Sequence, residues 1–502
     1  MRNLHHRVRH QRHPQESVPV APFRRRQASL KRRAAGKPNP HRSPRTAPSP
    51  ARRLALDVLQ SLRHAESPGF DAQLDDARRG SQVNAQDVAL AREIAFGVVR
   101  HRRWLEEILA RRLHKPLPAQ AHQVRDALLI GIYQALFLDR IPAHTIVDET
   151  VRLVAAARPE TGYRGLANAI MRKVTAAPRA DMLPDPETPW PILHGVPEWL
   201  SGEAEQLYRG DELVDFFAAC NAQAPLCLRA TALAGAAGDD DLLAAIKQEI
   251  ETHIQADADV ARGALPRSFL VRGRGIAPEL LPSFRAGIFT VEDEGAQIVS
   301  HLAGVKSGDA VLDLCASPGG KTSNIADLAG RKLLRFVACD VSEQKLTRLR
   351  DTLTRLQLME VVVTKLAEQA LEEERRESFD VVLVDAPCSA LGTMRRHPEV
   401  RWKRSARDLR AIARQQYEIL GNAARLVKPG GVLVYSVCTF TRVETDAVVD
   451  RFLQEHKGFA AADAPQNLPF DAKRLETTRG RWRTSPHQNG CDGFFIARMR
   501  KS

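Results

Sequence analysis

The sequence predicts a multidomain protein with an all-α domain, a small α+β segment and a doubly wound α/β domain, in that order. Three observations lead to this prediction. Apolar residues recur at helical spacing from Ala51 to about Val174. A proline-rich stretch, residues 184–191, then punctuates the chain as a linker does. From about Ala310 onward, short apolar runs alternate with helical stretches, which is typical of a parallel sheet covered by helices.

The first region carries several apolar stripes of helical period, and together they predict five to seven helices. Leu54, Val58 and Leu62 mark one stripe. Its longest apolar run, Leu128 to Leu138, is shorter than the roughly 18 residues that a membrane helix needs. We therefore expect a buried helix there and no membrane span. The other stripes lie at 94–98, 105–113, 124–138 and 146–154.

The later regions contain the predicted strands. The segment after the linker is mixed in pattern, and residues 227–229 look like a strand within it. In the last region the candidate strands are short apolar runs that end in small or polar residues. They lie at 311–314, 334–338, 361–363, 381–384 and 432–435, with 494–497 as a last edge strand.

The positive charge of the chain is concentrated at its start. The formal net charge is +14, and residues 1–50 supply most of it, with 11 arginines, two lysines and one acid. This segment is rich in arginine, histidine and proline and has few apolar residues, so we expect a disordered arm. It is either a solvated tail or a source of nonspecific affinity for RNA phosphates. The remaining chain is nearly neutral and needs its own argument for RNA binding.

Seven cysteines indicate the redox environment. Their number is odd and no CxxC pair occurs among them. This pattern favours a reduced, cytoplasmic protein over a disulfide framework, and it predicts no metal site. Most cysteines in proteins are small buried hydrophobic residues, and we assign Cys220, Cys227, Cys339 and Cys491 to that class.

A candidate cofactor loop joins the first predicted strand of the α/β domain to a helix. Small residues let the backbone approach a ligand closely, and a helix N-terminus favours polar groups. About 20 residues later, Asp340 ends the second strand, where an acid can bind both hydroxyls of a ribose. The two features together predict a nucleoside cofactor. The loop residues are Cys315, Ala316, Ser317, Pro318, Gly319, Gly320 and Lys321.

Two further strand ends carry reactive groups. Asp385 and Cys388 follow one predicted strand, and Cys438 follows another. In an open α/β sheet both ends lie at the carboxyl edge, beside the cofactor loop. Two thiols and a carboxylate next to a methyl donor suit methylation of cytosine at carbon 5. A thiolate that adds to carbon 6 activates carbon 5, and a carboxylate can bond the ring edge. The residues alone leave open which thiol attacks.

A basic run lies between these two strand ends and contains one aromatic residue, Trp402. Its basic residues predict a nucleic-acid groove beside the reacting site. The alternative is a solvated helix face, which is what most charged runs are. The residues that we expect to contact RNA are Arg395, Arg396, Arg401, Lys403 and Arg404, and Arg407, Arg410 and Arg414 lie beyond them.

Three segments, in this order, resemble the Nop/Sun family of RNA cytosine-C5 methyltransferases. They are LDLCASPGGKT at 312–322, DAPCSALGTMRRHPEVRW at 385–402 and YSVCT at 435–439. The helical region resembles the NusB domain, most clearly in RIPAH at 140–144 and GLANAIMR at 165–172. The resemblance implies a NusB-like domain at 51–180, an RNA-binding linker subdomain at 185–300 and a methyltransferase domain at 301–502. The last is expected to be Rossmann-like, with seven strands and one antiparallel edge strand.

The resemblance also implies a role for each site residue. Cys438 is expected to be the nucleophile, Cys388 to assist product release, and Asp385 to contact the target base and the cofactor side. The loop 315–321 and Asp340 are expected to bind S-adenosylmethionine. The chain departs from the family at two places. Val437 precedes Cys438 where the family often has threonine. Leu366 stands where the family has an acid near the adenine, and Glu368 is the nearest substitute.

The function that follows is methylation of carbon 5 of a cytosine in small-subunit rRNA, by a cytoplasmic monomer. The sequence does not specify the cytosine, nor whether the substrate is free rRNA or an assembling particle. The alternative is an RNA-binding assembly factor with a decayed catalytic domain, which Leu366 motivates and the retained thiols oppose. A small-molecule methyltransferase is disfavoured by the helical domain and the basic run.

Overall fold

The computed structural model describes residues 47–64, 67–80, 83–159, 162–184, 187–273, 275–365 and 377–502. Apart from its last four residues, the predicted basic arm lies outside these ranges, and so do Leu366 and Glu368. The described residues all belong to one compact unit, Thr46–Ser502. Within that unit the predicted order of an all-α, an α+β and an α/β region is confirmed. The boundaries at 50, 180–185 and 300 stay predictions.

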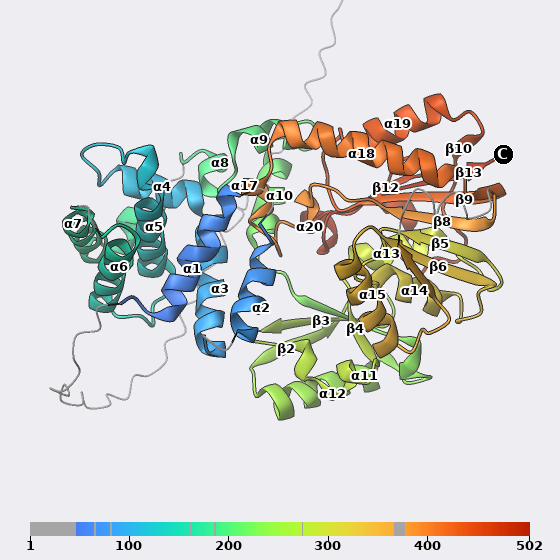
Figure 1. Ribbon diagram of the computed structural model, residues 1–502, viewed down its shortest axis with the longest axis horizontal. Coiled ribbons are helices and arrows are strands. Elements are labelled where there is room, and N and C mark those ends of the chain that lie inside the picture. The colour runs from blue at the N-terminus through green and yellow to red at the C-terminus, as the bar shows by residue number, and fades with distance from the viewer. Residues whose placement is uncertain are drawn as a thin grey trace, which may run out of the picture. The chain divides into compact units, whose positions relative to one another are not determined.

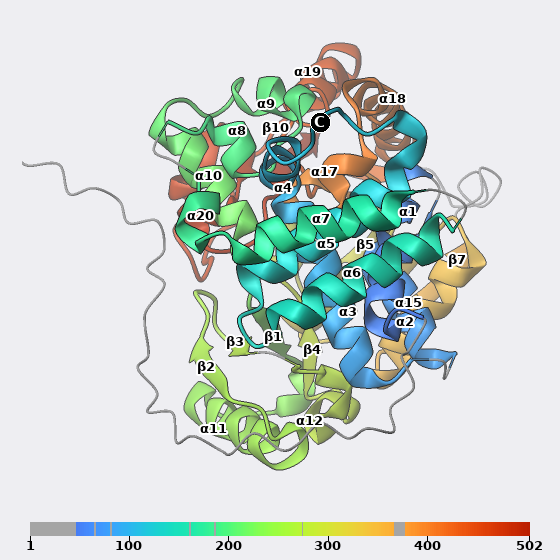
Figure 2. The same ribbon diagram turned by 90° about the vertical axis from the view of Figure 1, so that its left-hand side faces the viewer.

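The first region is helical throughout its described residues. Helix α5 lies at its centre because α1, α3, α4, α6 and α7 all pack against it, and Figure 2 shows α6 and α7 beside it. Of the helices that the structure describes in the whole chain, none is long and apolar enough to cross a membrane. The helices of this region are α1 (Pro50–Gln60), α2 (Phe70–Arg79), α3 (Ala85–Arg100), α4 (Arg102–Ala110), α5 (His122–Phe137), α6 (Ala143–Ala157) and α7 (Tyr163–Ala176).

The central position of α5 explains its sequence. A helix that is surrounded by others is apolar on nearly every face, and Leu128, Leu129 and Ile130 are all fully buried. Gly131 permits the close packing. A Cβ atom at that position would lie 2.5 Å from Oγ1 of Thr150 in α6. The apolar run at 128–138 therefore lies in a buried helix at the centre of the helical region, as predicted.

The middle region begins with three short helices and continues as an antiparallel sheet of order β2-β3-β1-β4. Leu242 and Ile246 of α11 pack with Phe269 of the sheet in one apolar cluster. The helices are α8 (Trp190–Leu193), α9 (Glu198–Ala204), α10 (Asp211–Asn221), α11 (Asp239–Glu249) and α12 (Pro282–Arg285). The strands are β1 (Leu226–Ala230), β2 (Ala258–Arg262), β3 (Ser268–Gly273) and β4 (Phe289–Val291).

The last region is built on five parallel strands in the order β7-β6-β5-β8-β9. The chain moves outward from β5 in one direction and then returns to add β8 and β9 on the other side. The carboxyl ends of β5 and β8 therefore flank a switch point, where ligands bind in sheets of this type. The strands are β5 (Ala310–Leu314), β6 (Arg335–Asp340), β7 (Val362–Lys365), β8 (Phe379–Asp385) and β9 (Val427–Val437).

The antiparallel edge differs in detail from the seven strands expected, because the described sheet has nine. Strand β13 (Phe495–Lys501) lies antiparallel beside β9. The position beyond β13 is divided between two short strands. β12 (Arg481–Arg483) pairs with residues 495–497, and β10 (Phe459–Ala461) pairs with residues 499–501. A hairpin then adds β11 (Glu476–Thr478). The extra strands thus come from a split edge position and one hairpin, and the fold class is unchanged.

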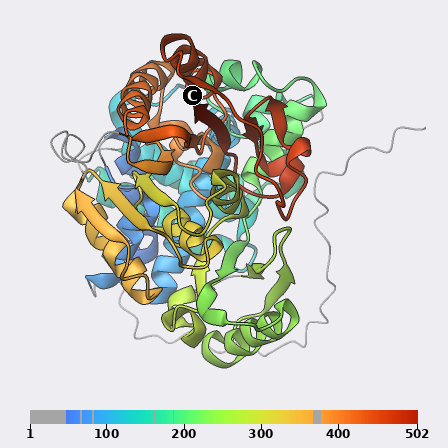
Figure 3. The same ribbon diagram turned by 90° about the vertical axis from the view of Figure 1, so that its right-hand side faces the viewer.

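Helices cover both faces of this sheet, as Figures 1 and 3 show. Alternation along each strand sends successive side chains to opposite faces. Val311 accordingly packs with the side of α13 to α15, and Leu312 packs with the side of α18 and α19. The helices are α13 (Glu294–Ala303), α14 (Gly320–Leu328), α15 (Glu343–Arg355), α17 (Val400–Lys403), α18 (Ala406–Ala424), α19 (Asp446–Glu455) and α20 (Pro486–Asn489).

The segment that follows β8 also contacts the helical region. Trp402 of α17 packs against the apolar core of that region, and its indole nitrogen donates a 3.1 Å hydrogen bond to the carbonyl of Val99. The carboxylate of Glu399 accepts a 3.2 Å bond from the backbone nitrogen of Phe70 at the start of α2. The helical domain is therefore docked on the same loop that carries Cys388.

Candidate active site

The predicted cofactor loop, residues 315–321, connects the end of β5 to the start of α14. Its backbone is fixed by two 2.8 Å hydrogen bonds, from the nitrogen of Ala316 to the carbonyl of Cys339 and from Gly319 to Ala316. Gly319 has a φ of 103°, and a Cβ atom there would lie 2.9 Å from the side chain of Leu349 in α15. Glycine is required at this turn because the backbone is left-handed and closely packed.

Asp340 lies where the sequence predicted, at the end of β6 and against this loop. Its two carboxylate oxygens accept hydrogen bonds from the backbone nitrogens of Ser317, at 3.2 Å, and Val341, at 2.7 Å. Lys345 of α15 lies 3.3 Å from the same carboxylate. The acid therefore links the loop, the strand end and the following helix.

Asp313 is a second acid at this edge, and the sequence analysis assigned it no role. It is fully buried in β5, and its Oδ2 accepts a 2.6 Å bond from the hydroxyl of Thr322. Its Oδ1 has no hydrogen-bond partner among the described residues. The pKa of Asp313 is raised to about 7, chiefly by burial and also by the charge of Asp385, and these effects outweigh the lowering by the Thr322 hydrogen bond and by Lys321. A buried acceptor without a partner requires an explanation, such as a ligand that supplies a donor.

The two thiols that the sequence singled out lie together. Cys388 follows β8, Cys438 follows β9, and their Sγ atoms are 3.2 Å apart. This is a hydrogen-bond contact, well beyond the roughly 2.05 Å of a disulfide. The contact with Cys438, together with burial, raises the pKa of Cys388 well above the ordinary thiol value. The Cys388 thiol therefore keeps its proton near neutral pH.

Asp385 and Lys321 form an ion pair beside the thiols. The Nζ of Lys321 lies 2.8 Å from Oδ2 of Asp385, and the hydroxyl of Ser436 donates a 2.6 Å bond to Oδ1. Burial lowers the pKa of Lys321, but the charges of Asp385, Cys438 and Glu292 outweigh burial, so the net shift is upward. Lys321 thus stays an ammonium close to Cys438, and a cation in that position favours a thiolate.

A buried glutamate joins the two cysteine loops, and the sequence analysis missed it. Glu444 is fully buried, and its carboxylate accepts bonds from the backbone and hydroxyl of Ser389, at 2.8 and 2.6 Å. It also accepts from Thr439, Thr441 and Gln416, at 3.3, 2.8 and 3.2 Å. The Thr-x-x-Glu spacing before an apolar helix indicates a local turn. Nothing in that spacing indicates the bonds to Ser389, 55 residues earlier.

The start of the basic run is neutralised inside the protein. Arg395 and Arg396 both pair with Asp293 and Asp492, with four nitrogen–oxygen distances between 2.7 and 3.3 Å. Arg395 is only 6% exposed. This box of two arginines and two aspartates ties α13 and the C-terminal segment to the loop after β8. The prediction of RNA contact is corrected at Arg395, because its guanidinium is buried between carboxylates.

Two further residues of the run, Arg401 and Lys403, also bond within the protein. Arg401 is fully buried and donates 3.0 Å bonds to the carbonyl of His194 and the side chain of Asn221, so the prediction of RNA contact is wrong for it as well. The ammonium of Lys403 donates to the backbone carbonyls of Ser67 and Pro68. Lys403, Arg404 and Arg396 are partly exposed, and for them RNA contact stays a prediction. The sequence suggested a nucleic-acid groove because the carboxylates and carbonyls that bind these basic residues come from distant segments. They are therefore not visible next to the run.

The cysteines outside the pair are buried or nearly so, as their sequence context indicated. Burial raises the pKa of both Cys220 and Cys315 to about 12, so neither thiol ionises near neutral pH. All seven cysteines of the chain are free thiols. Within the ranges that the structure describes, no group of three or more histidine, cysteine or acidic side chains is arranged to hold a metal ion.

Two family models match the chain. Residues 301–500 match the family described as 16S rRNA methyltransferase RsmB/F, and residues 49–176 match the NusB family. Relatives named ribosomal RNA small subunit methyltransferase B occur in several bacteria. The one from Pasteurella multocida is 34% identical over 427 residues, which cover 84% of this chain and 90% of the relative. The one from Klebsiella pneumoniae is 33% identical over 435 residues, covering 84% and 91%.

Solved structures show the same fold at lower identity. The crystal structure of PH0851 covers 90% of this chain and 99% of its own length, with a TM-score of 0.71 and 24% identity. NSun6 from Pyrococcus horikoshii with SFG covers 61% of this chain and 98% of its own length, with a TM-score of 0.52 and 20% identity. The first likeness extends over the described helical, middle and α/β regions together.

Proposed function

Because the chain belongs to the 16S rRNA methyltransferase RsmB/F family, we propose that it methylates carbon 5 of a cytosine in small-subunit rRNA through a covalent bond to Cys438. The observation that carries the proposal is the 3.2 Å contact between the Sγ atoms of Cys438 and Cys388 at the carboxyl edge of the sheet. The proposal makes small-subunit rRNA the partner and the cytoplasm the location. A monomer suffices, because all the reacting groups come from one chain.

The methyl donor of this family is S-adenosylmethionine, which supplies an electrophilic methyl group on a sulfonium. The residues at the carboxyl edge fit it. The buried Oδ1 of Asp313, which has no partner among the described residues, suits the ammonium of the amino-acid part. Asp340 at the end of β6 suits the ribose hydroxyls. The loop 315–321, whose backbone approaches closely at Gly319, would hold the part between them.

We assign a different chemical role to each thiol. The Cys438 thiolate adds to carbon 6 of the cytosine, and the electron pair of the ring double bond moves toward carbon 5. Carbon 5 would then accept the methyl group that the bound cofactor supplies, with the cofactor's sulfur as the leaving group. Cys388 takes the proton from carbon 5 and passes its own proton to the departing sulfur of Cys438. The ring double bond is restored, and both residues end as thiols.

Two neighbouring side chains prepare this chemistry. Lys321 stays charged beside Cys438 and favours its thiolate form. Asp385, held by Lys321 and Ser436, is assigned to the amine edge of the cytosine, where a carboxylate stabilises the charge that develops in the ring. A cytosine within structured rRNA has to leave its stack to reach these groups.

Methyl transfer to unmethylated small-subunit rRNA, followed by mapping of 5-methylcytosine, tests the proposal. Wild-type protein with labelled cofactor is expected to label one cytosine, and Cys438→Ala to label none. Cys388→Ala is expected to accumulate a protein–RNA adduct that survives denaturant, because the carbon 5 proton is not removed. Cys220→Ala, which removes a buried thiol outside the site, is the matched control and should behave as wild type.

The outcomes separate the parts of the proposal. Label at a ring position other than carbon 5, or undiminished label with Cys438→Ala, would contradict the covalent route. Normal turnover by Cys388→Ala without adduct would overturn the role of that thiol. No incorporation by wild type, despite tight RNA binding, would leave the RNA-binding assembly factor as the function.

A further inference from the structure

The outer face of α18 carries a row of arginines that the site described above does not use. Arg407, Arg410 and Arg414 are spaced by three and four residues, so they lie on one side of the helix. They line a groove of about 520 Å³ between α18 and α19. The other residues that line the groove are Ala413, Tyr417, Val443, Ala447, Val448 and Arg451. No carboxylate is among the lining residues.

The charge of this row is largely uncompensated. All three arginines are exposed, and within the described part of the chain none of them takes part in a salt bridge or a side-chain hydrogen bond that meets the usual distance limits. Two acids lie near the row. Glu418 follows Arg414 by one turn of α18. The pKa of Glu203 in α9 is raised by burial and by Glu444 more than the charge of Arg410 lowers it. Arg451, on the α19 side, is paired with Glu455. The net potential of the groove therefore comes from the row on α18.

The position of the row in its helix adds to this potential. Arg407 lies in the first turn of α18, and all three arginines lie in its N-terminal half. The positive end of a helix dipole disfavours cations and attracts anions. Three cations at this end weaken the helix slightly, and they strengthen its attraction for an anionic ligand.

The groove begins close to the thiols. Helix α18 starts at the carboxyl edge of the sheet, because it leads from the loop after β8 back to the start of β9. On its inner face, Gln416 donates to the carbonyl of Pro387, at 2.9 Å, and to Glu444. The groove is thus separated from the cysteine loops by the width of one helix, about 10 Å.

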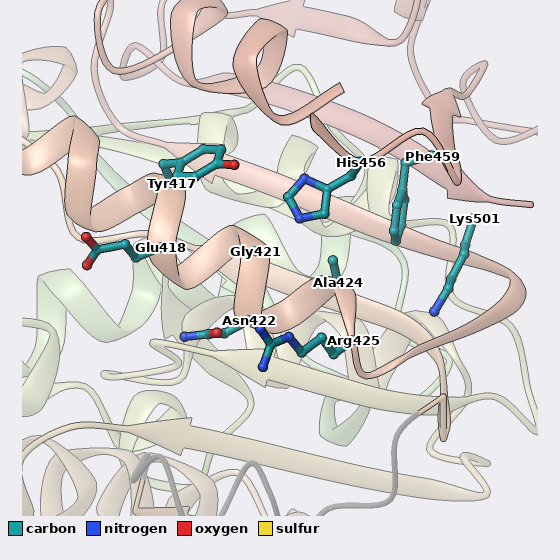
Figure 4. Close-up of a pocket in the computed structure, with 9 residues that line it drawn as sticks. All are labelled: Tyr417, Glu418, Gly421, Asn422, Ala424, Arg425, His456, Phe459 and Lys501. Carbon is teal, nitrogen blue, oxygen red and sulfur yellow. The ribbon is translucent and has the colours of Figure 1, made fainter. Parts of the chain in front are cut away.

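A second hollow continues the groove along the helix. It has a volume of about 590 Å³ and shares Tyr417 with the first. Figure 4 shows Tyr417 at one end of it and Arg425 directly after the end of α18, with His456 on the opposite wall. From Arg407 to its last residue, Ala424, the helix spans about 26 Å at 1.5 Å per residue. The two hollows meet at Tyr417 and form one track along α18. The second hollow is lined by the cations Arg425 and Lys501 and by one carboxylate, Glu418, so the row of arginines lies at the other end of the track.

We propose that this track binds the phosphate backbone of the RNA that flanks the target cytosine. The inference deepens the proposed function, on which it rests for the identity of the RNA. Guanidinium groups bind phosphates through paired hydrogen bonds, and a row of them follows a strand without reading its sequence. The groove thereby supplies the basic surface that Arg395 and Arg401, which are buried, do not.

Replacing the row by glutamine tests the proposal. The variant Arg407→Gln/Arg410→Gln/Arg414→Gln keeps helix propensity and removes three charges. The matched control, Lys473→Gln/Arg474→Gln/Arg479→Gln, removes three exposed charges near β11, at the far edge of the same sheet. Binding of an unmethylated small-subunit rRNA fragment is measured against salt concentration, with no cofactor present. Poly-glutamate serves as the probe for an acidic protein partner.

The row variant is expected to bind the RNA fragment on the order of 10- to 50-fold more weakly near 0.15 M salt. The reason is that each lost phosphate contact reduces, by about 0.7, the slope of the logarithm of the binding constant against the logarithm of salt concentration. The slope for the row variant is therefore expected to fall by about two. The control should keep the wild-type slope, and the melting temperature of the row variant should not fall, since cations at a helix N-terminus are unfavourable.

An unchanged slope in the row variant, or an equal loss in the control, would overturn the assignment. Loss of poly-glutamate binding with RNA binding intact would point to an acidic protein instead. Failure of the proposed function is distinguishable, because it would appear as absent 5-methylcytosine while the groove-dependent RNA binding persisted.

Discussion

Replacing Glu444 tests whether one buried carboxylate holds both cysteine loops in register. Five donors converge on it, from Ser389, Gln416, Thr439 and Thr441. In Glu444→Ala the three hydroxyls can rotate toward other acceptors. The backbone N–H of Ser389 and the amide of Gln416 cannot, and each buried donor left unsatisfied costs about 1–3 kcal/mol. We expect a loss of about 2–6 kcal/mol in the free energy of unfolding.

The same substitution is expected to slow the chemistry more than it weakens the fold. Ser389 follows Cys388 directly and Thr439 follows Cys438, so loosening either residue shifts a thiol. A displacement of about 1 Å in a reacting group costs on the order of 100-fold in rate. Glu444→Gln keeps an acceptor for the Ser389 nitrogen, and its amide can donate to the rotating hydroxyls. For Glu444→Gln we expect the free energy of unfolding to fall by about 1 kcal/mol and the rate of methyl transfer to change less than tenfold.

Three measurements check this reasoning: chemical denaturation, the single-turnover rate of methyl transfer, and the rate at which iodoacetamide alkylates Cys388 and Cys438. The last reports thiol geometry and would not respond to a general loss of stability under native conditions. Glu360→Ala, an exposed acid before β7, is the control and should leave all three unchanged. Wild-type stability and alkylation in Glu444→Ala would refute the positioning role. A 100-fold rate loss in Glu444→Gln with normal alkylation would show that the charge matters, and not the position.

Two other substitutions address the buried acid and the domain contact. Burial raises the pKa of Asp313 from 3.8 to about 7, so the folded state holds a proton that the unfolded state has released, and its contribution to stability falls as pH rises from about 4 to 7. The difference in unfolding free energy between wild type and Asp313→Asn should follow that fall, and a difference that is flat from pH 4 to 8 would contradict it. Trp402→Ala removes packing against the helical core and the bond to Val99. It is expected to lower the free energy of unfolding by about 1–3 kcal/mol and to make the helical region melt separately from the sheet. Calorimetry checks this against Arg404→Ala, and one unchanged transition in Trp402→Ala would be evidence against the contact.

The fold could be predicted because its signals are local. Apolar stripes at 3.6 spacing specify helices, and runs such as 311–314 and 381–384 specify buried strands without reference to partners. The edge of the sheet could not be predicted in detail. β10 and β12 are three residues each, and only their pairing with opposite halves of β13 defines them. Strands this short carry too few side chains for a pattern to be visible.

For the charged residues of the site, too, local features could be predicted from the sequence and long-range contacts could not. The basic run at 395–404 suggested RNA because a sequence shows charge and not its compensation. Asp293 lies about 100 residues before Arg395, and Asp492 lies 97 residues after it. No local pattern connects these residues, and only the fold makes them an ion-pair box. The arginines that remain exposed, at 407, 410 and 414, look no different in the sequence from those that are buried.

The assignment of the two thiols depends on the same kind of long-range information. Both cysteines follow strands, and their sequence contexts do not decide which one attacks. In the structure their surroundings differ. Contact with Cys438 and burial raise the pKa of Cys388, whereas Cys438 lies within the field of the Lys321 ammonium. The Cys388 thiol therefore keeps its proton, and of the two sulfurs it is Cys438 that lies near the Lys321 cation. This difference in surroundings is compatible with the proposed role of Cys438 as nucleophile, and the adduct expected from Cys388→Ala tests that role.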